Sequence, residues 1–203
     1  PAEGGVEVEL APVAHRRVEA AQAAGGAGAA DAAVVEREDA GPACPAGGVL
    51  LTGSDLEALS VWYDDAGLRS RKILTLRSDR YAMDSMYRLR MAEAMGTDPR
   101  LAIRNALASV AAKRPLCLSP TADSAAAPPV KWTSHRLVRV SRPVAPGPET
   151  LSMTELLAAT RQGESVWVRD VRRIYENAAR HNALLCSSLL LVFGDAPPPA
   201  CRP

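Results

Sequence analysis

The stretch Val166–Phe193, VWVRDVRRIYENAARHNALLCSSLLLVF, is the longest helix-compatible run of the chain, because no Pro or Gly occurs from Glu164 to Phe193. Its apolar residues recur every three or four positions, which is the period of one helix face. This pattern predicts one continuous helix with an interface made by Val168, Val171, Tyr175, Ala178, Asn182, Leu185, Leu189 and Val192.

The polar residue Asn182 lies in the middle of this face. In a coiled coil, a polar residue at such a position fixes register and partner number. The flanking positions are mostly apolar or small, however, and after Ala183 the apolar residues nearly circle the helix. A face this wide is typical of a helix inside a bundle or an obligate interface. For a plain core helix we expect Asn182→Leu to be stabilising.

Outside this helix, composition divides the 203 residues into further segments. We expect a flexible, acidic, Ala/Gly-rich arm over residues 1–47 and a helical basic subdomain over 48–115. A linker with a short strand is predicted over 116–150, because Pro, Ser and Ala dominate it. A helix, a turn and the long helix are expected over 151–195, with a Pro-rich tail over 196–203.

Local signals within 48–140 favour helices. Ser54 and Glu57 have the spacing of a capping box, and a helix is predicted over 79–95, with Gly96 as its end. A third helix should open at Asp98-Pro99 and bury one apolar face, made by Ile103, Ala106, Leu107, Val110 and Ala111. Short strands are plausible near 48–51, 72–76 and 132–140. The sequence therefore predicts a mainly α protein, with a helical bundle-like core and one or two short β segments.

The four cysteines, Cys44, Cys117, Cys186 and Cys201, form no CxxC or CxxH pair. Zinc sites use closely paired ligands, so no metal site is predicted. We expect these cysteines to act as small apolar residues in an intracellular protein. No secretion signal and no apolar run long enough to span a bilayer is visible in the sequence.

Charge is distributed unevenly along the chain. Residues 1–65 hold 12 acids and 3 bases, whereas residues 69–142 hold 15 bases and 5 acids. Such asymmetry indicates a polyanionic partner. The predicted nucleic-acid-binding residues are Arg69, Arg71, Lys72, Arg77, Arg80, Arg88, Arg90, Lys131, Arg136 and Arg139. Alternatively, Arg80, Asp84 and Arg88 form a salt-bridge ladder on a solvated helix, or the basic block pairs with the acidic arm or with another protein.

Four methionines, Met83, Met86, Met91 and Met95, fall on the helix predicted over 79–95. Methionine side chains are flexible and suit adaptable partner-binding surfaces. Met83, Met91 and Met95 also share one helical stripe with Tyr87, which favours ordinary core packing for these three.

No HExxH, GxSxG or GxxxxGK[ST] motif is present, and no catalytic set of residues is predicted. The carboxylate pairs Asp64-Asp65 and Asp55/Glu57 suit caps and solvated surface better than acid–base work or Mg²⁺ binding. We therefore expect a protein that is not an enzyme, with no cofactor, no small-molecule substrate and no membrane contact.

The leading hypothesis is a structural or assembly protein that docks through helix packing in a larger complex. A virion component or a subunit of a ribonucleoprotein or organellar complex fits this description, and the basic surface would then face nucleic acid. An alternative is a DNA-binding regulator with a helix-turn-helix-like segment at 152–180, where Arg169, Arg172, Arg173 and Arg180 decorate the second helix. A third is a small enzyme whose site has no local motif.

Overall fold

The protein contains a five-stranded mixed sheet, so the prediction of a mainly α, helical bundle-like core is wrong. The computed structural model describes residues 43–54, 57, 71–144, 166–193 and 199–202. Strands β1 (Val49–Thr52), β2 (Leu74–Arg77) and β3 (Leu116–Leu118) are parallel to one another. Strands β4 (Thr133–His135) and β5 (Val138–Val140) form an antiparallel hairpin that joins β3, and the strand order is β2-β1-β3-β5-β4.

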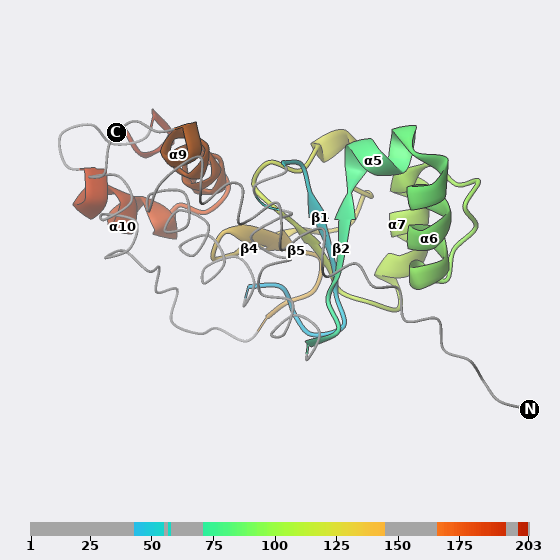
Figure 1. Ribbon diagram of the computed structural model, residues 1–203. Coiled ribbons are helices and arrows are strands. Elements are labelled where there is room, and N and C mark those ends of the chain that lie inside the picture. Colours follow the sequence, from blue (N-terminus) through green and yellow to red (C-terminus); the bar gives the residue numbers. More distant parts are fainter. Residues whose placement is uncertain (1–42, 55–56, 58–70, 145–165, 194–198, 203) are drawn as a thin grey trace, which may run out of the picture.

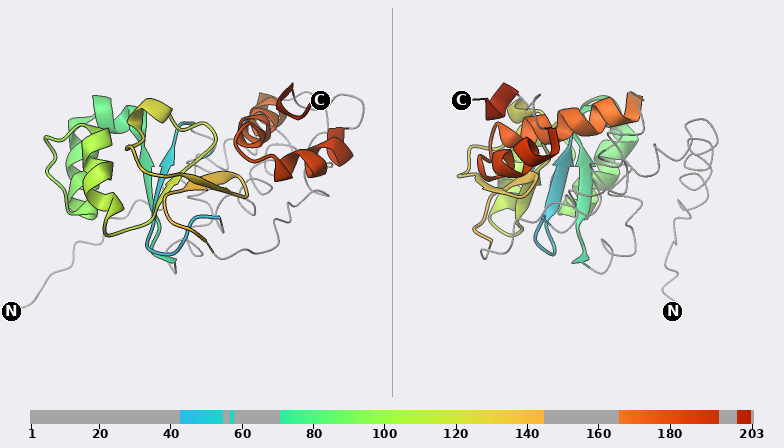
Figure 2. Two further views of the ribbon diagram at one scale, coloured as in Figure 1. Left: turned by 180° about the vertical axis from the view of Figure 1, so that it is seen from behind. Right: turned by 90° about the vertical axis from the view of Figure 1, so that its left-hand side faces the viewer.

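Helices lie on two sides of this sheet, as Figures 1 and 2 show. One group consists of α5 (Ser78–Met83), α6 (Ser85–Met95) and α7 (Ile103–Ala111). The other consists of α9 (Val166–Ala179) and α10 (Leu184–Phe193), with the short 3-10 helix η2 (Pro199–Cys201) beside them. A second 3-10 helix, η1 (Ser124–Ala126), contacts α7. Helix α7 packs against one face of the parallel strands, whereas α9 and α10 pack against Leu137 of the β4–β5 turn.

Residues of β1 and β3 alternate between two cores, as the period of a strand requires. Val49, Leu51 and Leu116 pack with Leu107 and Val110 of α7 on one face. The opposite face holds a smaller cluster, made by Ala43, Cys44, Leu50, Cys117, Val138 and Val140. The α7 face predicted from the sequence is confirmed, because Ala106, Leu107 and Val110 are buried and Ile103 and Ala111 pack against the same core.

The four cysteines form two disulfides, so their interpretation as unpaired apolar residues is wrong. Cys44 is bonded to Cys117 across the smaller core, and Cys186 is bonded to Cys201, which joins α10 to η2. The first bond closes a separation of 73 residues and the second a separation of 15. Two segments far apart in sequence, the chain before β1 and strand β3, are thereby held together covalently.

The helix predicted over 79–95 is divided in two at Asp84. Its backbone is extended there, and the Asp84 carboxylate caps α6 by accepting hydrogen bonds from the amides of Met86 (2.9 Å) and Tyr87 (3.0 Å). The expected salt-bridge ladder along one helix face is interrupted at the same point. Gly96 ends α6 in the left-handed conformation with φ of 68°, as the sequence predicted.

The long helix predicted over Val166–Phe193 is likewise two helices, α9 and α10, separated by a turn at residues 180–183. Asn182 organises this turn. Its side-chain amide donates to the carbonyl of Arg136 (3.0 Å), and its Oδ1 accepts from the amide of Leu184 (3.2 Å). Asn182 therefore acts as a link between the β4–β5 turn and the start of α10, and not as a polar residue in a coiled-coil seam.

This role reverses the expectation for Asn182→Leu. The substitution removes both hydrogen bonds and leaves the Arg136 carbonyl without this donor, so we expect the free energy of unfolding to fall by about 1–3 kcal/mol. Urea unfolding followed by circular dichroism measures the change. An equal or higher unfolding midpoint in Asn182→Leu would show that the turn does not depend on these bonds.

Candidate functional site

The carboxyl ends of β1 and β3 form the position at which parallel α/β folds commonly bind ligands. The chain leaves β1 to form β2 on one side and later returns to form β3 on the other. At such a reversal the loops that follow the two strands separate and leave a crevice. Here the two loops carry Gly53-Ser54 and Ser119-Pro120-Thr121.

The Glu57 side chain fills this crevice. Glu57 is 2% exposed, and its carboxylate accepts hydrogen bonds from the Ser119 hydroxyl (2.6 Å), the Thr121 hydroxyl and the Thr121 amide (3.2 Å). The loops also touch directly, since a Cβ built on Gly53 would lie 1.9 Å from the Thr121 carbonyl oxygen. Glu57 therefore joins the β1 and β3 loops and leaves no room for a ligand between Gly53 and Thr121.

One half of the capping box predicted at Ser54 and Glu57 is confirmed, since the Ser54 hydroxyl accepts from the Glu57 amide (3.1 Å). The Glu57 carboxylate accepts from the amide of Gly53 (3.2 Å), one residue before the predicted partner. The sequence spacing identified this local pairing. It did not identify Ser119 and Thr121, which lie more than sixty positions further along the chain.

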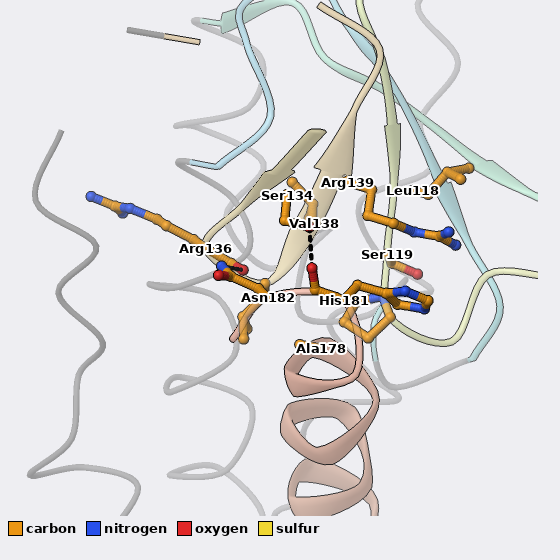
Figure 3. A pocket seen from close by; sticks show the side chains of 11 residues that line it. Leu118, Ser119, Ser134, Arg136, Val138, Arg139, Ala178, His181 and Asn182 are labelled. Carbon is orange, nitrogen blue, oxygen red and sulfur yellow. Dashed lines mark hydrogen bonds between the residues drawn. The ribbon is translucent and has the colours of Figure 1, made fainter. Parts of the chain in front are cut away.

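A small open pocket lies on the other side of Ser119, between β3, the β4–β5 hairpin and the turn that joins α9 to α10 (Figure 3). Together with the solvent at its mouth it encloses about 200 Å³. Its polar side chains come from Ser119, Ser134, Arg136, Arg139, His181 and Asn182. Figure 3 shows Arg139, Ser119 and His181 lying on the same side of the hairpin, with Arg136 pointing the opposite way.

Most of these polar groups are already bonded to other parts of the protein. The Ser119 hydroxyl donates to Glu57, and the Ser134 hydroxyl donates to the His181 carbonyl (2.5 Å). Arg139 and His181 differ, because in the part of the chain that the structure describes neither side chain has a hydrogen-bond or ion-pair partner. These two side chains are the groups of the pocket that remain available to a ligand.

The pKa values of both Arg139 and His181 are lowered. Burial lowers the pKa of the Arg139 guanidinium. The pKa of His181 is lowered by burial first, and then by the positive charges of Arg139 and Arg180. The imidazole of His181 is therefore neutral in a larger fraction of molecules near pH 7 than an ordinary histidine.

The predicted nucleic-acid-binding residues fall into separate groups in the structure. Two of them support the fold: Arg71 donates to the carbonyl of Cys44 (2.7 Å), and Arg77 is paired with Asp79. Of the rest, Arg80, Arg88 and Arg90 lie on α5 and α6, whereas Lys131, Arg136 and Arg139 lie on or next to the β4–β5 hairpin, across the sheet from α6 (Figure 1). Lys72 is exposed beside β2, and Arg69 lies outside the described residues. Nucleic-acid binding stays a prediction.

The predicted interface face of the long helix is largely internal. Val171, Tyr175, Ala178, Leu185 and Leu189 are at most 3% exposed, and they pack together with Leu137 of the β4–β5 turn. Asn182 is buried at the turn. The side chains of Val168 and Val192 lie outside the described part of the structure. These residues hold α9 and α10 together and to the hairpin.

Three of the exposed large apolar side chains in the described ranges lie close in sequence, on α5 and α6. Met83 is 80% exposed, Met86 59% and Leu89 48%. Met86 and Leu89 are three residues apart on α6 and therefore share a face. We call Met83, Met86 and Leu89 the apolar patch. Met91 and Met95 instead pack into the core with Tyr87, so the four methionines divide between surface and core.

Several further sequence predictions lie partly or wholly outside the described residues. Asp55, Asp64 and Asp65 are among them, as is the first helix of the helix-turn-helix-like segment. Within the described ranges, no group of three or more His, Cys, Asp or Glu side chains could hold a metal ion. No helix in those ranges is both long and apolar enough to cross a membrane.

Comparison with known proteins does not assign this fold or its pocket to a family. No protein-family model matches the sequence, and neither a curated protein nor a solved structure shows significant similarity to the chain.

Proposed function

We propose that this protein is a non-catalytic assembly protein that associates with a second copy of itself through the apolar patch on α5 and α6. The exposure of Met83, Met86 and Leu89 is the observation that carries the proposal. Large apolar side chains grouped on a surface lower the free energy of association when a partner covers them. Full burial of one Met or Leu side chain contributes about 1.5–3 kcal/mol.

The charges around the patch suit a second copy better than a polyanion. Residues 78–95 carry three acids, Asp79, Asp84 and Glu93, and three bases, Arg80, Arg88 and Arg90. A two-fold interface brings the same surface of both copies together. A segment with this balance of charges repels its own copy only weakly, and mixed signs allow Arg and Glu side chains to pair across the interface. A strongly basic surface would instead oppose this arrangement.

The chain offers a matched test of this interface. We expect Met86→Glu combined with Leu89→Glu to weaken self-association more than about 100-fold, because two apolar contacts are lost and two like charges are added. Both side chains are exposed in the single chain, so the fold should be retained. Light scattering over a concentration series gives the mass, and circular dichroism checks the fold.

Leu184→Glu combined with Leu190→Glu serves as the control. These residues of α10 are 67% and 42% exposed, so they match the patch in chemistry and accessibility but lie on the other side of the sheet (Figure 1). The control should associate as the unchanged protein does. A monomeric unchanged protein at micromolar concentrations, or equal loss in both double variants, contradicts the proposal.

A further inference from the structure

The pocket between β3, the β4–β5 hairpin and the α9–α10 turn combines positive charge with two available donors. None of the residues that line it is an Asp or Glu, so the lining supplies no carboxylate to Arg139. The donors that face the space are the Arg139 guanidinium and the His181 imidazole, since Ser134 and Asn182 donate to backbone carbonyls and Ser119 donates to Glu57.

We propose that this pocket binds a small oxyanion, of which a phosphate group is the best fit, between the Arg139 guanidinium and the His181 imidazole. A guanidinium presents N–H groups in a planar fork that matches the oxygens of phosphate. The imidazole supplies a further N–H from the opposite wall, since Arg139 belongs to β5 and His181 to the α9–α10 turn. The pocket is small and open to solvent, which favours an ion or one phosphoryl group over a drug-sized ligand.

The geometry of the walls is fixed by the hydrogen bonds described above. Ser134 of β4 holds the His181 carbonyl, and Asn182 holds the Arg136 carbonyl, so the turn and the hairpin cannot separate without breaking two bonds. The backbone from which both donor side chains project is therefore held in place before any ligand arrives. Such preorganisation reduces the entropy lost on binding.

Binding of an anion should be coupled to protonation of His181. Among the described residues, the charges that act on the imidazole are those of Arg139 on β5 and Arg180 next to the end of α9, and both are positive. They disfavour the imidazolium, whereas a bound anion favours it. Phosphate should therefore bind more tightly to the protonated form, by about tenfold, and bound phosphate should tighten proton binding at His181 by the same factor.

Inorganic phosphate is the probe for this site, and the full-length chain is the protein to use. Nuclear magnetic resonance of the imidazole protons follows the titration of His15, His135 and His181 separately, with His181→Asn to assign the third. We expect phosphate to raise the pKa of His181 well beyond the change caused by sodium chloride of equal ionic strength. The chloride comparison is essential, because salt alone screens the arginines.

Two variants distinguish phosphate binding in the pocket from non-specific attraction of phosphate to positive charge. Arg139→Gln removes the guanidinium of the pocket and should abolish the phosphate-specific change. Arg180→Gln removes a neighbouring charge that does not line the pocket, and should preserve it. Equal responses to phosphate and chloride in the unchanged protein, or a phosphate response that survives Arg139→Gln, would overturn the proposal. Loss of self-association in the α6 variants would leave this result unaffected, so the two proposals fail independently.

Discussion

Replacing Cys44 and Cys117 together by Ala is expected to lower the free energy of unfolding by about 4 kcal/mol, because the bond closes a separation of 73 residues. Cross-linking positions this far apart restricts the unfolded chain strongly. Both residues are also fully buried between Leu50, Val138 and Val140, so the folded state loses packing at the same site. Urea unfolding of the purified, oxidised protein measures the effect.

The second disulfide provides the comparison. Cys186–Cys201 closes a separation of only 15 residues, for which the same relation gives about 3 kcal/mol. We expect the Cys186→Ala, Cys201→Ala protein to be the more stable of the two double variants. An unchanged unfolding midpoint after loss of Cys44 and Cys117 would mean that this bond does not restrict the unfolded chain as expected. Preparation without reductant is required, since disulfides persist only in oxidising surroundings.

Glu57→Ala is expected to have a comparable effect, a loss of about 3 kcal/mol or more. The substitution removes the acceptor for the Ser119 and Thr121 hydroxyls and for the amides of Gly53 and Thr121. Buried donors that lose their acceptor retain the full penalty of desolvation, and hydrogen bonds to a charged group are stronger than neutral ones. A cavity in the crevice adds to the loss.

Glu57→Gln and Ser54→Ala are the comparison variants for the loss of stability expected in Glu57→Ala. The Gln variant keeps the shape and one acceptor oxygen, so it should be intermediate between Ala and the unchanged protein. Ser54→Ala removes only the bond to the Glu57 amide, and it should cost about 1 kcal/mol, as is usual for a helix cap. If Glu57→Ala were no more destabilising than Ser54→Ala, Glu57 would be a local cap and not a link between the β1 and β3 loops.

The sheet could be predicted only in part because its strands are three or four residues long. The strands predicted near 48–51 and 72–76, from short β-branched and apolar runs, are confirmed at 49–52 and 74–77. Strand β3 was interpreted as linker, since Pro115 and Pro120 flank its three buried residues. Pairing with β1 and β5, which no local pattern reveals, makes this segment a central strand.

Helix lengths were overestimated for a related reason. Periodicity continued through Asp84 and through Asn182, and neither position holds a Pro or Gly. Both side chains instead bond backbone groups and start a new helix, at α6 and α10. Asp and Asn compete for backbone hydrogen bonds in this way, which explains their preference for caps over helix interiors.

The pocket residues Arg139 and His181 are far apart in the sequence, so no local pattern predicts that they meet. Arg139 was singled out from the charge of the 69–142 segment, but His181 had no partner at helical spacing. The β4–β5 hairpin and the α9–α10 turn bring the two together. The two disulfides could not be assigned either, since four cysteines allow three pairings and spacing does not choose among them.

Amide hydrogen exchange at two protein concentrations tests self-association through the apolar patch most directly. Covering α6 with a second copy should slow the exchange of its first turn, residues 85–89, as concentration rises, while the exchange of α10 stays the same. The Met86→Glu, Leu89→Glu protein should lose this dependence. Exchange of α6 that is identical at both concentrations, in a sample that light scattering shows to be associated, would place the interface elsewhere and contradict the account.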